Sequence, residues 1–259
     1  LCLGAATVTL EAQDAARAPR NLEEFDAMFR ELSNWGRWGA DDERGTLNLI
    51  TPAKTREAAS LVRSGITVSL AHNPMPEEAS DNPATAFEHI MGRSLRSDTY
   101  RFTYHGYGVS HIDALCHLAH NGRLYNDVPF SANTSEGCGT NGIHNLKSGI
   151  VTRGILLDFP RLKGVPYLEP MTPIYIEDIE AWERRWGPAP RGGLVLLLTG
   201  WSEKWDTPRE FLGYDSQGRM HFPGFGPASA RLLLEQRGAA GLGIDTHGLD
   251  PGSDDAFQV

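Results

Sequence analysis

The chain has 259 residues, 40% of them hydrophobic, and a formal net charge of −9 at pH 7. This length and apolar content are enough for one globular enzyme domain with a sizeable core, and they require no second domain. The acidic balance, without a long basic cluster or an apolar run of membrane-spanning length, disfavours nucleic acid and membranes as partners.

Residues 1–20 are expected to be an N-terminal extension ahead of a domain over residues 21–259. Residues 1–10 are small and apolar and residues 11–20 are Ala-rich and polar, which fits either the remnant of a secretory signal peptide or a disordered extension. The signal-peptide alternative places the protein in the periplasm or outside the cell, and the other alternative places it in the bacterial cytoplasm.

Helix signals occur in four places along the chain. Asn21 can cap a first helix, and Thr51, followed by a proline, opens a second helix that Gly65 closes. The first helix has one apolar face at three- and four-residue steps, made by Leu22, Phe25, Met28, Phe29 and Leu32. Two later helices are expected over residues 177–186 and 227–237.

Strand signals alternate with these helices. Short apolar runs typical of strands lie at residues 66–70, 100–104, 150–159, 194–198 and 240–244. The run at 194–198 is continuous, as expected for a fully buried strand, whereas the segment 73–88, which contains three prolines, is expected to be an exposed loop. The alternation of strands and helices predicts an α/β domain.

Residues 104–117 gather three imidazoles and a carboxylate in one short segment. His111 and Asp113 are two residues apart, so on an extended segment both side chains point to the same side, with Ile112 facing the core. His117 follows Asp113 by four residues, a spacing that a turn of helix or a short loop brings back over the same spot. Imidazole and carboxylate ligands favour a divalent ion such as Zn²⁺ or Mn²⁺. The alternative is a set of hydrogen-bonded structural histidines.

The three cysteines, Cys2, Cys116 and Cys138, do not form a disulfide framework. Cys116 lies directly before His117, where a nucleophile or a metal ligand is conceivable. We interpret it as a small buried core thiol.

The segment Ser110-His111-Ile112-Asp113, together with His117, resembles the second half of a known signature, His-x-Gly-Thr-His-x-Asp-x-Pro-x-His. That signature belongs to the cyclase-like metal hydrolases, the family that includes bacterial kynurenine formamidase and isatin hydrolase. Tyr107 occupies the position of the family's first His. His105, two residues earlier, is an alternative source of that imidazole, in a His-Gly pair similar to that of a longer-chain branch of the family.

The resemblance continues in order from about Asn34 to the end of the chain. The matching blocks lie at residues 34–39, 41–43, 45–48, 122, 125–126, 149–158, 198–201 and 243–246. The family implies a single α/β domain with a mixed β-sheet or flattened β-barrel core flanked by helices, assembled as a homo-oligomer, a dimer or a tetramer. Relatives continue through another His and an acidic residue, so we expect the chain ending at Val259 to lack part of the site.

The function that the resemblance implies is hydrolysis of a small amide, lactam or lactone by metal-activated water, with an aryl formamide or an isatin-like compound as substrate. His111 and Asp113 are the expected metal ligands, with Zn²⁺ or Mn²⁺ as the cofactor. His117 and His105 are the expected catalytic residues, and His117 would be the proton carrier or part of a second metal site.

Four further residues are candidates for contact with the substrate. Tyr107 belongs to the motif, and His120 and Tyr125 follow it closely. His247 comes three residues after the strand expected at 240–244. Residues at such strand ends commonly face a site in α/β proteins, although a plain turn also explains His247.

Two rival classes of function stay open at this point. A non-catalytic small-molecule binding protein on the same fold, or an inactive fragment, is consistent with Tyr107 in the place of a ligand. A serine hydrolase is disfavoured, because the chain contains no Gly-x-Ser-x-Gly sequence.

Overall fold

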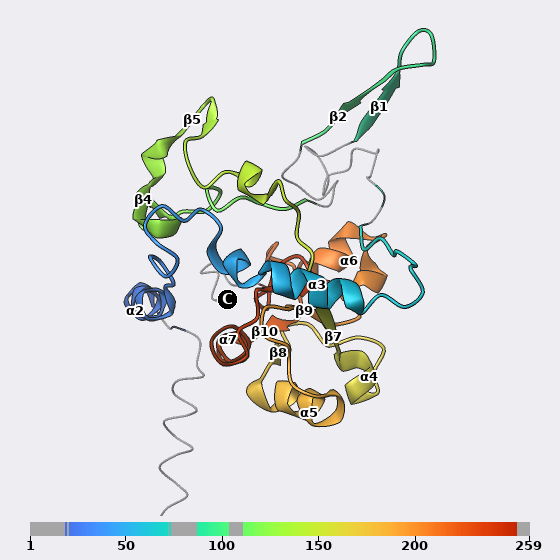
Figure 1. The fold of residues 1–259 in the computed structure, drawn as a ribbon. Helices are drawn as coiled ribbons and strands as arrows, with labels where there is room; N and C mark the ends of the chain where they lie inside the picture. The colour runs from blue at the N-terminus through green and yellow to red at the C-terminus, as the bar shows by residue number, and fades with distance from the viewer. Residues whose placement is uncertain (1–18, 20, 72, 74–86, 104–110, 253–259) are drawn as a thin grey trace, which may run out of the picture. The chain divides into compact units, whose positions relative to one another are not determined.

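The computed structural model describes residues 19, 21–71, 73, 87–103 and 111–252 (Figure 1). These residues form two compact units. The first, here called the sheet unit, lies within Leu1–Trp38, Gly45–Leu61 and Ile150–Val259, and the second, the motif unit, lies within Gly39–Arg44 and Val62–Gly149. In the described part of the chain, no helix is both long and apolar enough to cross a membrane.

The first helix has the predicted cap. α2 (Leu22–Leu32) begins after Asn21, whose Oδ1 accepts a hydrogen bond from the Glu24 N–H at 2.9 Å. On its apolar face, the Phe29 ring packs edge-on against Trp35, with the ring centroids 5.6 Å apart. The two ends of that face are exposed, so α2 is only partly covered within the sheet unit.

The second helix also begins as predicted but ends earlier. α3 (Pro52–Ser60) follows Thr51, whose Oγ1 accepts a hydrogen bond from the Lys54 N–H at 3.3 Å. The predicted end at Gly65 is wrong, because Leu61 already caps the helix by donating its N–H to carbonyls of the preceding turn. The chain therefore leaves the helix before it reaches the glycine.

Three parallel strands form the main sheet of the described residues. β7 (Gly154–Asp158) and β11 (Gly241–Ile244) lie on either side of β9 (Leu194–Leu198), in the order β11, β9, β7. All three coincide with predicted apolar runs, although the run at 150–159 forms a strand only in its second half. The α/β fold class is confirmed, and the sheets of the described residues are open rather than closed into a flattened barrel.

Helices and short turns complete the sheet unit. α5 (Ile176–Trp186) confirms the helix predicted over 177–186, and Asp178 in its first turn accepts a hydrogen bond from the Tyr175 N–H at 3.1 Å. The helix predicted over 227–237 consists of α7 (Pro227–Arg231) and a π-helical turn, η6 (Leu232–Gln236). The other elements are η1 (Gly45–Leu49), α4 (Phe159–Lys163), β8 (Pro173–Ile174), η5 (Trp201–Lys204), α6 (Pro208–Leu212) and β10 (Gly224–Phe225), with β8 and β10 paired in parallel.

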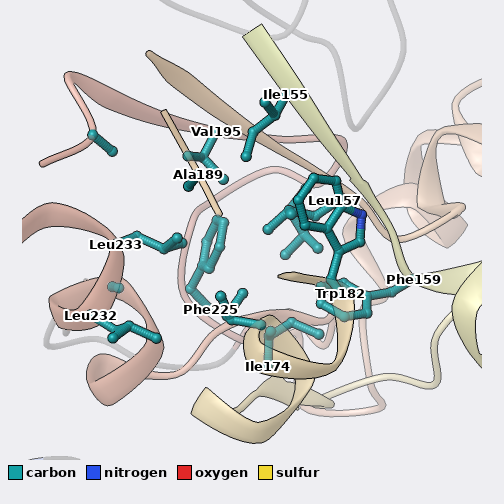
Figure 2. Packing of buried hydrophobic residues seen from close by; sticks show 14 of the residues in the cluster. Ile155, Leu157, Phe159, Ile174, Trp182, Ala189, Val195, Phe225, Leu232 and Leu233 are labelled. Atoms are coloured by element: carbon teal, nitrogen blue, oxygen red, sulfur yellow. The ribbon is translucent and has the colours of Figure 1, made fainter. Parts of the chain in front are cut away.

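One hydrophobic cluster holds the sheet unit together (Figure 2). Side chains from β7, β9, α5, the β8–β10 pair and the π-helical turn point into the same interior. Labelled there are Ile155, Leu157, Phe159, Ile174, Trp182, Ala189, Val195, Phe225, Leu232 and Leu233. Burial alternates along β7: Ile155 and Leu157 are buried, whereas Leu156 is 51% exposed. The cluster therefore packs on one face of this strand.

The motif unit has little regular structure. Its strands form short antiparallel pairs, which are β1 (Glu88–Met91) with β2 (Asp98–Arg101), β3 (Arg123–Leu124) with β4 (Val128–Pro129), and β5 (Asn133–Thr134) with β6 (Gly137–Cys138). Its 3₁₀ turns are η2 (Tyr125–Asp127), η3 (Phe130–Ala132) and η4 (Ile143–Leu146). Among its described residues, the buried ones are Cys116, Leu124, Tyr125 and Asn141. Specific polar and covalent links, rather than a large apolar core, therefore hold this unit.

Two strand predictions in the motif unit are wrong in whole or in part. Residues 66–70 are irregular, and Ile66, Val68 and Leu70 are all more than 75% exposed (77%, 76% and 81%). A strand needs a neighbour for its backbone N–H and C=O groups as well as an apolar alternation, and in the described residues this segment pairs with no neighbour. The strand predicted over 100–104 ends at Arg101. Residue 104, most of the loop predicted over 73–88 and nearly all of the N-terminal extension lie outside the described residues.

Candidate metal centre

The Asp113 carboxylate lies between two imidazoles. Its Oδ1 is 3.5 Å from Nε2 of His111, and its Oδ2 is 3.8 Å from Nε2 of His117. The backbone here is irregular, and a turn closed by a 2.9 Å hydrogen bond from the His117 N–H to the Ala114 carbonyl brings His117 back toward Asp113. The structure therefore brings together three residues that the sequence spacing predicts to share one site.

This segment is open to solvent. The side chains of Asp113 and His117 are 43% and 40% exposed, whereas that of His111 is 19% exposed. Ile112 is 59% exposed, so the prediction that it faces the core is wrong. The reason is that residues 111–114 do not belong to a sheet, so the period-two alternation of a strand does not apply to them. Water and a small substrate can reach the carboxylate and the His117 ring.

The donor types and their spacing fit a divalent ion. Both separations exceed the roughly 2.7–3.2 Å of N–H···O hydrogen bonds. The 3.5 Å separation between His111 and Asp113 is close to the roughly 3.3 Å between neighbouring ligands of a tetrahedral Zn²⁺ with bonds of about 2.0–2.1 Å. No group of three or more His, Cys, Asp or Glu side chains among the described residues is arranged to hold an ion alone. His111 and Asp113 therefore have the donor types for two ligand positions, and the described residues supply no complete set of ligands.

Cys116 and Cys138 form a disulfide, which corrects the interpretation of Cys116 as a free thiol. Cys116 is buried as predicted, at 3% exposure. The β5–β6 pair places Cys138 with its Cα atom 6.2 Å from that of Cys116, within the range that a disulfide spans. The two cysteines are 22 positions apart in the sequence, and nothing in that spacing indicates the pairing, because it depends on how the hairpin folds back.

Two of the predicted substrate-binding residues lie next to the motif in the same unit. The backbones of His120 and Arg123 exchange two hydrogen bonds of 2.9 Å, and Nε2 of His120 is 3.1 Å from the side-chain nitrogen of Asn121. Tyr125 is buried, and its hydroxyl donates a 2.8 Å hydrogen bond to Oδ2 of Asp42. Burial and the Asp42 carboxylate both raise the pKa of Tyr125, so the hydroxyl stays protonated. Contact with substrate stays a prediction for both residues.

An acidic pair that the sequence analysis did not single out for the site organises this region. Glu43 Oε2 accepts hydrogen bonds from the Asn141 N–H at 2.6 Å and from the Asn145 side-chain amide at 2.7 Å. The Asn126 side-chain amide donates to the Asp42 carbonyl at 2.8 Å. The sequence does contain a signal for these contacts, since residues 41–43 and 126 belong to the matching blocks.

The remaining predicted site residues lie in the sheet unit or outside the described residues, so their place at this centre is not tested. His247 belongs to the sheet unit, where its ring meets Phe222 edge-on with the centroids 6.0 Å apart. Nearby, the Asp245 carboxylate accepts hydrogen bonds from both the N–H and the hydroxyl of Thr199 at 2.7 Å. His105 and Tyr107 lie outside the described residues, so their predicted roles are not tested.

Comparison with known families gives one match over most of the chain. A family model described as "Putative cyclase" matches residues 34–251. No protein of curated function matches the sequence.

Solved structures with the same fold include a novel cyclase and two isatin hydrolases. The novel cyclase is 28% identical, with a TM-score of 0.67, over 85% of this chain and 79% of the other. Isatin hydrolase A from Ralstonia solanacearum is 23% identical, with a TM-score of 0.54, over 78% of this chain and 77% of the other. Isatin hydrolase A from Labrenzia aggregata, bound to benzyl benzoate, is 22% identical, with a TM-score of 0.51, over 76% and 75% of the two chains. The likeness to the two hydrolases is one of fold.

Proposed function

We propose, from the premise that the chain belongs to the cyclase family whose model it matches, that the protein is a metal-dependent hydrolase of a small amide, lactam or lactone. The observation that carries the proposal is the Asp113 carboxylate held between His111 and His117 in an exposed segment. Isatin is a cyclic amide, and the shared fold with two isatin hydrolases supports a substrate of this kind.

In this proposal, His111 and Asp113 hold the ion, and His105 is the preferred third ligand. A bound divalent ion supplies a water of lowered pKa, from about 15.7 towards roughly 7, and polarises the carbonyl under attack. Zn²⁺ and Mn²⁺ both suit this mixture of nitrogen and oxygen ligands.

His117 has the proton-transfer role. Its Nε2 lies 3.8 Å from Oδ2 of Asp113, next to the proposed metal ligands. The ring is 40% exposed, which allows it to reach a substrate that approaches from solvent. An imidazole so placed can take a proton from the attacking water and return it to the leaving amine or alkoxide.

The test is metal content and hydrolysis in matched variants. His111→Ala and Asp113→Ala are expected to lose the metal ion and all turnover of isatin, an N-formyl aryl amine and an aryl lactone, while circular dichroism stays unchanged. His144→Ala, a histidine of the same unit in η4, is the control and is expected to keep both properties. Full metal occupancy in both site variants would contradict the proposed centre. A metal-bound protein that binds these compounds without hydrolysing them would favour the alternative of a non-catalytic binding protein.

We also propose that the protein assembles as a homo-oligomer, a dimer or a tetramer. Ile66, Val68 and Leu70 expose apolar side chains along one segment of the motif unit, and a contiguous exposed apolar surface is typical of association sites. Sedimentation velocity at micromolar concentration tests this, and a single monomeric species would contradict it.

A further inference from the structure

Cys116 anchors the segment 111–120, which carries the proposed metal ligands and is here called the metal-binding segment. Across residues 111–120 it alone is buried, whereas its neighbours Leu115 and Leu118 are 40% and 70% exposed. It lies inside the turn that closes between Ala114 and His117. Whatever fixes Cys116 therefore also fixes the direction in which the chain presents His117.

Three links hold Cys116, and all lead to the same part of the motif unit. Its Sγ is bonded to that of Cys138 in β6. Its carbonyl accepts a 2.8 Å hydrogen bond from the Asn133 side-chain amide in β5, and its N–H donates to the Asn141 carbonyl at 3.2 Å. The covalent link dominates, because each hydrogen bond exchanges for one with water when the segment opens, whereas the disulfide does not.

The two asparagines that hold Cys116 are themselves incompletely satisfied. The side-chain oxygens Oδ1 of Asn133 and Asn141 are buried and accept no hydrogen bond in the described structure. A buried acceptor without a donor favours opening of the region to water. The disulfide opposes that opening by limiting how far residues 116 and 138 can separate.

We propose that the Cys116–Cys138 disulfide is a positioning element for the metal centre, and that its reduction weakens binding of the divalent ion by loosening the segment that carries His111 and Asp113. This inference rests on the proposed function for its metal readout. The disulfide binds no metal itself and acts by fixing the backbone that carries the proposed ligands.

The chemistry of the release is a thiol–disulfide exchange. Cys138 is exposed, so a thiolate of an external dithiol such as dithiothreitol attacks its Sγ, and Cys116 leaves as a thiolate that takes up a proton. The second thiol of the reagent then attacks the mixed disulfide and frees Cys138. Overall the protein disulfide gains two electrons and two protons and becomes two thiols, while the dithiol is oxidised to its cyclic disulfide.

A rival outcome follows from the same bond breaking. The freed Cys116 thiolate stands beside His117 and could itself bind a soft or borderline ion, which would raise rather than lower the affinity for Zn²⁺. Mn²⁺ prefers oxygen and imidazole ligands, so it responds to the positioning of the segment and little to a new thiolate. Mn²⁺ is therefore the diagnostic probe.

The experiment compares three samples of the 259-residue chain, each carrying Cys2→Ser. The first is oxidised, the second is reduced, and the third carries Cys116→Ala and Cys138→Ala as well. Thiol titration is expected to find no free thiol in the oxidised chain and two after reduction. Isothermal titration with Mn²⁺ is expected to show the dissociation constant rising roughly 10- to 100-fold on reduction, and equally in the double variant. An unchanged or falling dissociation constant in both samples overturns the proposal, as does a pair of free thiols in the untreated chain.

Hydrogen exchange in the metal-free chain gives a readout that does not depend on the ion. Amides of residues 111–120 are expected to exchange faster after reduction, while those of β9 and β11 in the sheet unit stay protected and show that the protein remains folded. Unchanged exchange at 111–120 contradicts the positioning role. If the oxidised chain binds no Mn²⁺ or Zn²⁺, the proposed function fails, and the exchange result still decides whether the disulfide holds the segment.

Discussion

The hydroxyl of Tyr125 and the carboxylate of Asp42, 83 residues apart in the sequence, are joined by a hydrogen bond of 2.8 Å. Asn126 adds a second link to the same segment, because its side-chain amide donates to the Asp42 carbonyl. These contacts join residues 39–44 to η2, the turn that follows the segment of the proposed metal ligands. They make Asp42 part of the framework of the motif unit.

Removing that hydroxyl is expected to loosen the motif unit. In Tyr125→Phe the carboxylate of Asp42 loses its donor, which corresponds to a loss of about 1.5–3 kcal/mol for a hydrogen bond to a charged group. Hydrogen exchange of peptides that cover residues 123–146 measures the free energy of opening. Tyr214→Phe in the sheet unit is the control. Equal protection in Tyr125→Phe and the parent chain would show that the bond contributes nothing.

The same hydrogen bond predicts that the stability of the motif unit falls at high pH. Burial and Asp42 raise the pKa of Tyr125 above the value of about 10 found in unfolded chains. As the pH rises, the unfolded state loses this proton first, so the stability is present below about pH 10 and lost above it. The free energy of opening of the parent chain is expected to fall more steeply between about pH 10 and 11 than that of Tyr125→Phe. Parallel slopes would rule out a raised pKa.

His117→Gln separates metal binding from catalysis. The ion is expected to remain, since His111 and Asp113 are unchanged, while turnover falls by roughly two to four orders of magnitude, as for loss of a general acid–base group. Metal analysis and steady-state kinetics on the same preparation test both statements, with His144→Gln as the matched variant. Undiminished turnover would make His117 a structural residue.

An ion pair in the sheet unit predicts that the stability of this unit depends on pH in the acid range. Glu183 accepts hydrogen bonds from Nε and Nη2 of Arg237 at 2.8 and 2.7 Å and from the Ala189 N–H at 3.1 Å. The Arg237 hydrogen bond is the main cause that lowers the pKa of Glu183. Its stabilisation is therefore present above the unfolded pKa of about 4.3 and is lost as the pH falls through the lowered folded value.

Glu183→Gln is accordingly expected to cost about 1–3 kcal/mol at pH 7, with the difference from the parent shrinking below about pH 4. Tryptophan fluorescence in urea measures this, because all six tryptophans lie in the sheet unit. Glu180→Gln, at an exposed position of the same helix, is the control and should change stability by less than about 1 kcal/mol. A cost that does not vary with pH would mean that the charge of Glu183 is irrelevant.

Two leucines on neighbouring strands test the one-sided core. Leu197 in β9 is 1% exposed and Leu156 in β7 is 51% exposed. Leu197→Ala is expected to destabilise the sheet unit by about 2–5 kcal/mol, the range for a buried large-to-small change. Leu156→Ala should cost well under half of that. Similar losses for both, measured by urea denaturation, would mean that both faces of the sheet are packed.

The parts of the fold that the sequence predicts are those determined by local pattern. The apolar run at 194–198 and the cap at Asn21 each contain their own signal, and both form as expected. The segment 66–70 has the same apolar alternation but needs a pairing strand, which its sequence does not encode. Within the site, the spacing of His111, Asp113 and His117 predicts their approach. The disulfide partner of Cys116 depends on the return of a hairpin, which spacing alone does not reveal.

The hydroxyl of Thr55 donates a 3.1 Å hydrogen bond to the carbonyl of Val151, so two positions 96 residues apart in the sequence are neighbours within the sheet unit. In the sequence, the long segment of the motif unit, Val62–Gly149, lies between Leu61 and Ile150 of the sheet unit. Such a topology resembles a domain insertion, in which the host domain keeps its strand register when the inserted segment changes in sequence. Sequence variation in that segment can therefore accumulate at little cost to the register of the parallel sheet.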